Sequence, residues 1–221
     1  MIDLHTHTLL SDGELLPSEL VRRAEVKGYE AIAITDHADS SNIDFVLPRI
    51  VKVSKILNKN WKIRTIPGVE ITHAPLKEIS PLVKLARKNG ARIVVVHGET
   101  VSEPVIKGTN RCAIEAGCDI LAHPGLITKS DIELAVKKGV YLEITTRKSH
   151  SPANRRLVKI ALPLGAKLVI DNDAHSGDDL VSYKTALSIL KKLDLKASDI
   201  DDIFKNSRIL AGKAIKTLGI K

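Results

Sequence analysis

Short hydrophobic runs rich in β-branched residues alternate along this chain with longer amphipathic stretches. Strands separated by helices form right-handed β-α-β units and therefore a parallel sheet. Seven such units in 221 residues favour a closed or nearly closed α/β barrel over an open sheet. The predicted strands are Ile2–Leu4, Ala31–Thr35, Arg64–Val69, Arg92–Val96, Ile120–Ala122, Val140–Ile144 and Lys167–Ile170.

Amphipathic helices are predicted between these strands, and glycines stand where helices give way to strands, as in KKGV, KNGA and PLGA. Residues 177–221 are expected to add C-terminal helices, so that residues 1–221 form one domain. A hydrophobic fraction of 43% is enough for the core of such a domain. The other helices are expected over Pro17–Lys27, Asp44–Asn58, Ile79–Asn89, Thr109–Ala116, Ser130–Lys138 and Asn154–Leu164.

The composition bears on the cellular location of the protein. No apolar run reaches the roughly 20 residues of a membrane span, and the N-terminus has no pattern typical of a signal peptide. The two cysteines, Cys112 and Cys118, are predicted to be free thiols rather than a disulfide. These features predict a cytoplasmic protein without a membrane partner, and nothing in them favours one oligomeric state.

The formal charge of +8 at pH 7 attracts anionic partners. Aromatic residues make up only 3% of the chain, so it has few surfaces on which unpaired bases can stack. The basic residues are also spread along the whole sequence rather than gathered in one segment. The charge therefore favours a small anionic substrate, with nucleic acid as the less favoured partner.

Residues that bind metals lie at or just after the predicted strands. His5 and His7 end the first strand, and because alternate side chains of a strand point to the same face, they project together. The carboxyl ends of the strands surround the active site in α/β barrels. Six of the eight histidines stand at such positions, which a scattered arrangement would not produce. The corresponding zone of the later strands holds Asp36, His37, Glu70, His97, His123, Glu143, Asp173 and His175.

The motifs HTHTLLSDG, TDH, GVE, VVVH, AHP and DNDAH, in this order over residues 1–176, resemble the PHP superfamily, named for polymerase and histidinol phosphatase. The resemblance implies a distorted (β/α)7 barrel of the TIM type, with up to three metal ions at the carboxyl ends of the strands. The implied ligand sets are His5, His7, Glu70 and Asp173 for one metal, Glu70 (bridging), His97 and His123 for a second, and Asp12, His37 and His175 for a third.

Imidazole and carboxylate ligands without a thiolate suit Zn²⁺, Mn²⁺ or Fe²⁺. Two cations bridged by a carboxylate share a hydroxide or a phosphate oxygen, and water bound to such a centre becomes a nucleophile near neutral pH. The sequence therefore predicts a metal-dependent phosphoesterase, similar to histidinol phosphatases, with two or three divalent ions. The expected substrate is a small phosphorylated metabolite: histidinol phosphate, a sugar phosphate or a nucleotide. Catalysis is expected to depend on Glu70, His97, Asp173 and His175.

Three alternatives remain open at this point. An amidohydrolase-type enzyme also begins with His-x-His on its first strand, but that class generally has a bridging carboxylated lysine after the fourth strand, where this chain has VVVHG. A nuclease fits the polymerase-associated members of the superfamily, although the few aromatic residues weigh against it. A non-enzymatic barrel subunit would be expected to have lost metal ligands, and here every motif position is filled.

Two loops at the same end of the barrel carry further candidates. In TTRKSHS, after the sixth strand, Arg147 can bind a phosphate through two parallel hydrogen bonds and Lys148 supplies a point charge. The alternative for this pair is a solvated basic patch. Lys107, after the fourth strand, is a candidate to close over a ligand. His73 and His150 are expected to be solvent-exposed histidines.

Three further carboxylates near the motifs are not assigned as metal ligands. Asp36 is expected either to orient His37 or to form a hydrogen bond in the turn that follows it. Glu143 is expected to orient a ligand or to bind substrate. Asp171 is expected to point away from the site, so Asp173 is the ligand chosen from the DNDAH motif.

Overall fold

The strands of the barrel lie side by side in chain order, apart from one short strand. In the computed structural model, which describes residues 1–219, the sheet has the order β1-β2-β4-β5-β6-β7-β8, and β3 pairs with β4. Every pairing is parallel, which confirms the predicted distorted α/β barrel. The strands are β1 (Ile2–Asp3), β2 (Ala31–Ile34), β3 (His37–Ala38), β4 (Arg64–Ile71), β5 (Ile93–His97), β6 (Ile120–Ala122), β7 (Tyr141–Thr145) and β8 (Leu168–Asp171).

The segments that follow the first and last strands contact each other and bring the two edges of the sheet together. Thr6 forms an isolated parallel bridge with Ala174. The amide of His7 donates a hydrogen bond to the carbonyl oxygen of Ala174 over 2.8 Å. This contact joins the segment after β1 to the segment after β8, and it brings the two ends of the predicted ligand series together.

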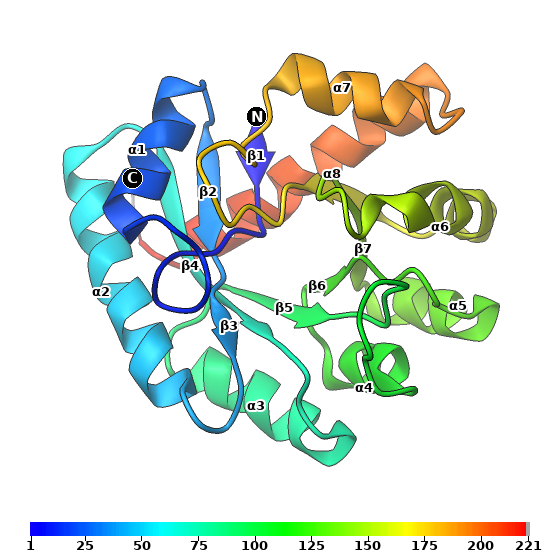
Figure 1. Ribbon diagram of the computed structural model, residues 1–221, viewed down its shortest axis with the longest axis horizontal. Helices are drawn as coiled ribbons and strands as arrows, with labels where there is room; N and C mark the ends of the chain where they lie inside the picture. Colours follow the sequence, from blue (N-terminus) through cyan, green and yellow to red (C-terminus); the bar gives the residue numbers. More distant parts are fainter. Residues whose placement is uncertain (220–221) are drawn as a thin grey trace.

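Helices cover the outside of the barrel, as Figure 1 shows. The helices α1 to α6 lie close to their predicted ranges. No helix among residues 1–219 is long and apolar enough to cross a membrane. The helices are α1 (Pro17–Val26), α2 (Ile43–Asn60), α3 (Leu76–Lys88), α4 (Thr109–Ala116), α5 (Lys129–Lys138), α6 (Asn154–Ala161), α7 (Tyr183–Lys191) and α8 (Ala197–Lys216), with the 3-10 turns η1 (Ser151–Ala153) and η2 (Leu162–Leu164).

Several element boundaries differ from the prediction, and two of the differences have a local cause. β2 ends at Ile34 because the amide of Thr35 turns to the carbonyl oxygen of Thr6, 2.8 Å away. The chain then pairs with β4 as the separate strand β3. The helix α3 begins at Leu76 rather than Ile79, directly after Pro75, whose φ is −54°. Proline is well tolerated at a helix start because its missing N–H has no intrahelical partner there.

The amino end of the barrel is closed by α8. Leu4 and Ile66 belong to one buried cluster with Leu210, Ala211 and Ala214 of that helix. In Figure 1 the helix crosses behind the strands, on the side opposite the loop that follows β1. Apolar packing thus occupies one end of the barrel and leaves the carboxyl end for polar side chains.

Two predictions about the organisation of the chain have different outcomes. Cys112 and Cys118 are free thiols, as predicted, with Cys118 buried and Cys112 partly exposed. That residues 1–221 form one domain stays a prediction, and residues 220–221 lie outside the described residues.

Candidate metal centre

The nine predicted metal ligands converge at the carboxyl end of the barrel. They come from segments at the ends of β1, β3, β4, β5, β6 and β8, so the folding of the barrel assembles them. Five of them, Asp12, His37, His97, Asp173 and His175, line a cavity of about 510 Å³. The other four, His5, His7, Glu70 and His123, are buried next to these residues.

The first predicted ligand set surrounds a small space at the bottom of the site. Nε2 of His5 lies 3.3 Å from Oε2 of Glu70 and 3.7 Å from Oδ1 of Asp173. Nε2 of His7 lies 3.6 Å and 3.1 Å from the same two oxygens. Ligand atoms about 2.0–2.2 Å from one tetrahedral ion lie roughly 3–3.5 Å apart. The spacing therefore suits one small divalent cation.

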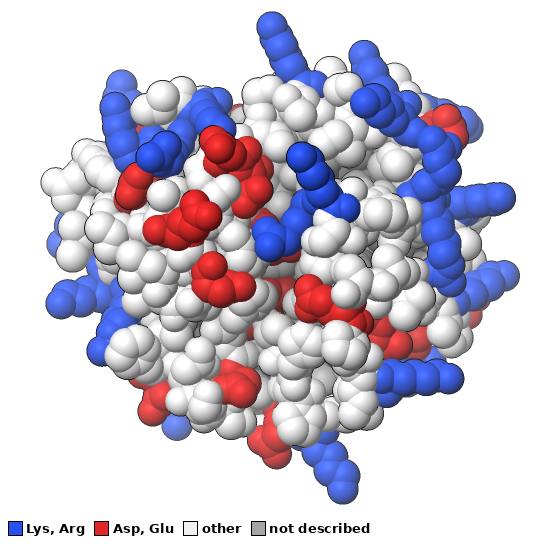
Figure 2. Space-filling model, in the orientation of Figure 1, with Lys and Arg blue, Asp and Glu red and all other residues white. Residues whose placement is uncertain are grey.

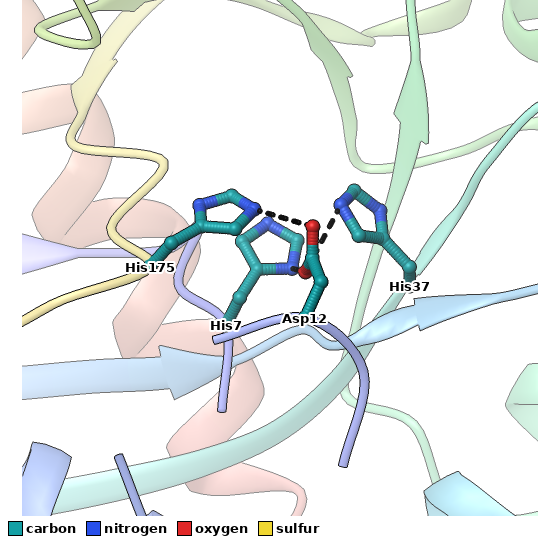
Figure 3. A group of neighbouring side chains, drawn as sticks. All are labelled: His7, Asp12, His37 and His175. Atoms are coloured by element: carbon teal, nitrogen blue, oxygen red, sulfur yellow. Dashed lines mark ion pairs between the residues drawn. The ribbon is translucent and has the colours of Figure 1, made fainter. Parts of the chain in front are cut away.

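The third predicted set surrounds the carboxylate of Asp12 (Figure 3). Nε2 of His175 lies 3.2 Å from Oδ2 of Asp12, and Nε2 of His37 lies 3.5 Å from Oδ1. The ring of His7 is 4.1 Å from the rings of both His37 and His175, measured between centroids. Ligand atoms of all four residues lie within 4.8 Å of one another, so His7 adds an imidazole to this set.

The second predicted set is open on the side of Glu70. Nε2 of His123 lies 3.9 Å from Oε1 of Glu70, and the rings of His97 and His123 meet edge to face with centroids 4.5 Å apart. β5 and β6 approach closely at this point, where a Cβ on Gly98 would lie 2.3 Å from the carbonyl oxygen of Ala122. Glycine after His97 therefore lets the two strands bring their histidines together.

The backbone is strained at two of the predicted ligands. His123 has a φ of 30° and Asp173 a φ of 51°, in the left-handed region that residues with a side chain adopt at a cost in free energy. His73, which also lines the cavity, has a φ of 50°. Such conformations persist only where the surrounding structure enforces them, and they cluster at functional sites.

Buried polar atoms without a hydrogen-bond partner gather in this centre, among the residues that the structure describes. A buried polar group left unsatisfied costs about 1–3 kcal/mol. Divalent cations accept such lone pairs from imidazole and carboxylate, and these ligands suit Zn²⁺, Mn²⁺ or Fe²⁺. The residues present therefore fit the metal ions that the sequence predicts. The atoms that face the predicted ligand sets are Nε2 of His5, both ring nitrogens of His7 and both carboxylate oxygens of Glu70.

Two buried carboxylates next to the centre lie as expected: Glu143 contacts a predicted ligand, and Asp171 does not face the cavity. Oε2 of Glu143 lies 2.6 Å from Nδ1 of His5, which holds the other ring nitrogen of His5 toward the site. Carboxylates in this position fix the orientation of ligating histidines. Asp171 accepts a hydrogen bond from the amide of Leu4 over 2.6 Å, and it does not line the cavity.

Asp36 binds the loop after β1, which neither expectation for this residue included. Its Oδ1 accepts hydrogen bonds from the amide of Thr8 over 2.7 Å and from the hydroxyl of Ser11 over 2.8 Å. Because Asp12 follows directly in this loop, Asp36 fixes a predicted metal ligand, although not His37.

His150 is buried in the site, so the prediction of an exposed histidine is wrong. Only 3% of the residue is exposed. Its Nε2 lies 3.4 Å from Oε1 of Glu103 and 3.9 Å from Oδ2 of Asp173. The residue was missed because its contacts come from segments distant in the sequence. His73, with 44% of its side chain exposed, agrees with the prediction.

Glu103 is a second residue that the motifs did not reveal. It lies in the loop between β5 and α4, and its Oε2 is 3.2 Å from Nε2 of both His73 and His97. The hydrogen bond from His97, helped by His73 and by the charge of His150, lowers the pKa of Glu103 to about 2. The carboxylate is therefore ionised at neutral pH. The only sequence signal was an acidic residue in the loop after a predicted ligand.

Arg147 lines the cavity, whereas Lys148 and Lys107 are exposed and do not. Nη1 of Arg147 donates a hydrogen bond to the carbonyl oxygen of Asp173 over 3.1 Å and lies 2.8 Å from Nδ1 of His175. The guanidinium group is thus held beside the predicted ligands. Substrate binding by the two lysines stays a prediction without support from their positions.

The cavity is acidic before any cation binds. Asp12, Asp39, Glu103 and Asp173 line it, and Arg147 is the one Lys or Arg among its described lining residues. Figure 2 shows acidic side chains gathered near the centre of this face, while most Lys and Arg side chains project from its edge. An anionic substrate would be repelled here unless divalent cations offset the carboxylate charges.

Burial shifts the pKa values of the imidazoles in the centre. It lowers the pKa of His123 well below its ordinary value and that of His150 to about 4. Burial also lowers the pKa of His5, but the charges of Glu143, Glu70 and Asp173 outweigh it and raise this pKa overall. Neutral imidazole is the form that binds a metal, so His123 and His150 need no deprotonation at neutral pH.

Comparison with known proteins identifies the family. The profile of the PHP domain matches residues 3–102. An uncharacterized protein of Methanocaldococcus jannaschii is 47% identical over 189 residues, which cover 85% of this chain and 87% of that protein. A probable phosphatase of Shewanella sp. (strain ANA-3) is 31% identical over 222 residues, which cover 87% of this chain and 83% of the relative. This chain belongs to the PHP family. This PHP protein is accordingly a metal-dependent hydrolase.

Solved structures share the fold of this PHP protein. A chain of an archaeal ribonuclease P, solved with mature tRNA, superimposes with a TM-score of 0.74 at 18% identity, covering 97% of this chain and 91% of that one. The histidinol phosphate phosphatase of Lactococcus lactis, solved with zinc, L-histidinol and phosphate, gives a TM-score of 0.61 at 18% identity and covers 87% and 91%. At such identities the likeness establishes the barrel alone.

Proposed function

We propose that this PHP protein hydrolyses the phosphate ester of a small metabolite, with two or three divalent cations, Zn²⁺, Mn²⁺ or Fe²⁺, held by the nine predicted ligands. The observation that carries the proposal is the convergence of these imidazoles and carboxylates on one cavity whose lining includes Arg147. Relatives named as phosphatases support it. Histidinol phosphate, a sugar phosphate and a nucleotide are the candidate substrates.

The two central carboxylates are arranged to serve two cations each. Oε2 of Glu70 faces His5 and His7, while Oε1 faces His123. Oδ1 of Asp173 faces the same two histidines, and Oδ2 faces His123. When bound there, divalent cations would supply Lewis acidity and an activated water. We assign the catalytic role to Glu70 and Asp173 together with His97 and His175, whose side chains reach the cavity.

Arg147 is proposed to bind the phosphate group. Two of its nitrogens already contact Asp173 or His175, which fixes the guanidinium group at the cavity wall. Its Nη2 donates no hydrogen bond among the described residues and remains available for a phosphate oxygen. A planar guanidinium pairs with two oxygens at once and adds orientation to charge. Lys148 would add only a distant point charge.

The size and charge of the cavity favour a small substrate over nucleic acid. About 510 Å³ lies within the range of pockets for small ligands. A duplex would have to place its backbone over the acidic centre of this face. A 5′-terminal phosphate of a single strand would still enter, so oligonucleotides belong in the substrate panel. A cytoplasmic location remains part of the proposal and rests on composition.

The proposal is tested with metal-free protein reloaded with Zn²⁺, Mn²⁺ or Fe²⁺ in turn. Release of inorganic phosphate is measured from an aryl phosphate, from histidinol phosphate, sugar phosphates and nucleotides, and from a 5′-phosphorylated oligonucleotide. Turnover that requires metal and is greatest on a small monoester is the expected result. A protein that binds the metals and hydrolyses none of these compounds contradicts the proposal, whereas preference for internal cleavage of the oligonucleotide identifies a nuclease.

A further inference from the structure

The proposed metal centre has one more imidazole than the motifs account for. We propose that His150 is a tenth metal ligand, which joins His97 and His123 in binding the second cation. The inference rests on the proposed function, because it concerns the same centre. Ligand nitrogens of the three histidines lie within 4.8 Å of one another, and all three residues are buried.

The direction of the His150 ring is the first argument. Its ring is stacked on that of His123, with centroids 4.1 Å apart and an angle of 15° between the planes. The two Nε2 atoms point at the same carboxylate oxygen, Oδ2 of Asp173, from 3.9 Å and 3.8 Å. A nitrogen that is oriented like that of a predicted ligand, and toward the same oxygen, is positioned to bind the same cation.

The other ring nitrogen of His150 supplies the second argument. Nδ1 lies 2.8 Å from the hydroxyl of Thr100 and 2.7 Å from the hydroxyl of Ser102. Either hydroxyl can accept a proton from Nδ1, which leaves the lone pair of Nε2 free toward the centre. A ligating histidine generally has its second nitrogen fixed in this way by a neighbouring acceptor. Thr100 and Ser102, in the loop that follows β5, supply these acceptors for His150.

A third argument is the kind of ligand at the second position. The predicted set is His97, His123 and one oxygen of Glu70, and Oδ2 of Asp173 also faces His123. With His150 this position has three imidazoles, whereas the first position has two imidazoles and the same two carboxylates. A nitrogen-rich set favours Zn²⁺ or Fe²⁺ over Mn²⁺, which binds oxygen more readily. The two positions should therefore differ in metal preference.

The decisive variant is His150→Asn. The asparagine amide can take the place of Nδ1 and donate to Thr100 and Ser102, but it has no atom at the position of Nε2. His150→Ala removes both interactions. Zn²⁺ and Co²⁺ are titrated into metal-free protein against a chelator, and the visible spectrum of bound Co²⁺ is recorded. Both variants should bind one cation more weakly, by more than the roughly 10–100-fold typical of lost outer-shell partners.

A matched control is Asn154→Ala, in the same segment. Asn154 is also 3% exposed, and its amide donates to the carbonyl oxygen of Thr145 over 2.7 Å, away from the cavity. This variant should lose stability without losing metal affinity. A His150→Asn protein with wild-type affinity for every cation and an unchanged Co²⁺ spectrum would overturn the inference, while leaving the proposed function intact if the wild type is active.

A measurement on the wild-type protein decides the question even if no variant folds. Imidazole ¹⁵N resonances are recorded before and after Zn²⁺ is added. Nε2 of His150 should move into the range of a metal-bound nitrogen, together with Nε2 of His123. If the His123 resonance shifts and the His150 resonance does not, the inference about His150 is refuted, but the proposed metal centre is not. Failure of every imidazole to respond refutes the proposed metal centre as a whole.

Discussion

The two ends of the barrel are made from the same strands but hold opposite kinds of side chain. In β4, Ile66 packs with Leu210 of α8 at the amino end, and Glu70 lies among the histidines at the carboxyl end. β5 likewise runs from the buried Ile93 to His97. In each strand, a residue that packs in the core and a residue of the candidate metal centre are therefore four positions apart. The difference implies that substitutions at one end should change stability and those at the other should change activity.

The largest effect is expected at the carboxyl end. Glu70→Gln keeps the shape of the side chain but removes the charge that faces both His5 and His123. Loss of several kcal/mol of charge stabilisation, about 4 kcal/mol, corresponds to roughly 10³-fold in kcat/KM. His97→Ala should have a comparable effect. Phosphate release gives the activity, and thermal unfolding should show an intact fold. Near-normal turnover in either variant would remove these residues from the site.

The reverse result is expected at the amino end. Leu210→Ala removes a side chain that is 6% exposed and belongs to the buried cluster at the amino end. Leu-to-Ala changes in cores lower the free energy of unfolding by about 2–5 kcal/mol. Chemical denaturation measures this loss, and kcat of the folded protein should stay near that of the wild type. If kcat fell as far as in Glu70→Gln, the two ends would not be separable.

Arg147 lies at the carboxyl end but is not a metal ligand, so its variants separate substrate binding from metal binding at that end. A charge-assisted contact to phosphate contributes about 1.5–3 kcal/mol, so Arg147→Ala should lower kcat/KM by roughly 10–100-fold. Arg147→Lys should recover part of this, since an ammonium cannot replace the planar fork. Metal content, measured by elemental analysis, should not change. Wild-type kinetics in both variants would make the TTRKSHS loop an ordinary basic surface.

The smallest effect is expected at the two thiols, which belong to neither end. Burial raises the pKa of the Cys118 thiol well above its ordinary range and raises the pKa of Cys112 to a smaller extent. A thiol reagent at pH 8 should therefore modify Cys112 slowly in the folded protein and Cys118 only after denaturation. Modification of Cys112 should leave turnover unchanged. Rapid reaction of both thiols would mean that the helical layer opens readily.

Much of this architecture follows from the sequence because strand and helix periodicities differ, and because barrel strands carry functional residues at one end. His5, Glu70 and His123 could be chosen for that reason. His150 and Glu103 could not, since their positions depend on how two irregular loops fold across the cavity. β3 was missed because it exists only through pairing with β4, and its two residues have no periodicity of their own.

The left-handed backbone at His123 and Asp173 has a consequence for how this fold changes over generations. Each such conformation costs on the order of 1–3 kcal/mol, which the rest of the barrel has to offset. Glycine adopts the same conformation without that strain. In a descendant no longer selected for hydrolysis, His123→Gly would relieve this strain, at the cost of the packing of a buried ring. The backbone conformation alone gives no reason to keep a side chain at these two positions, so their ligands depend on continued selection for turnover.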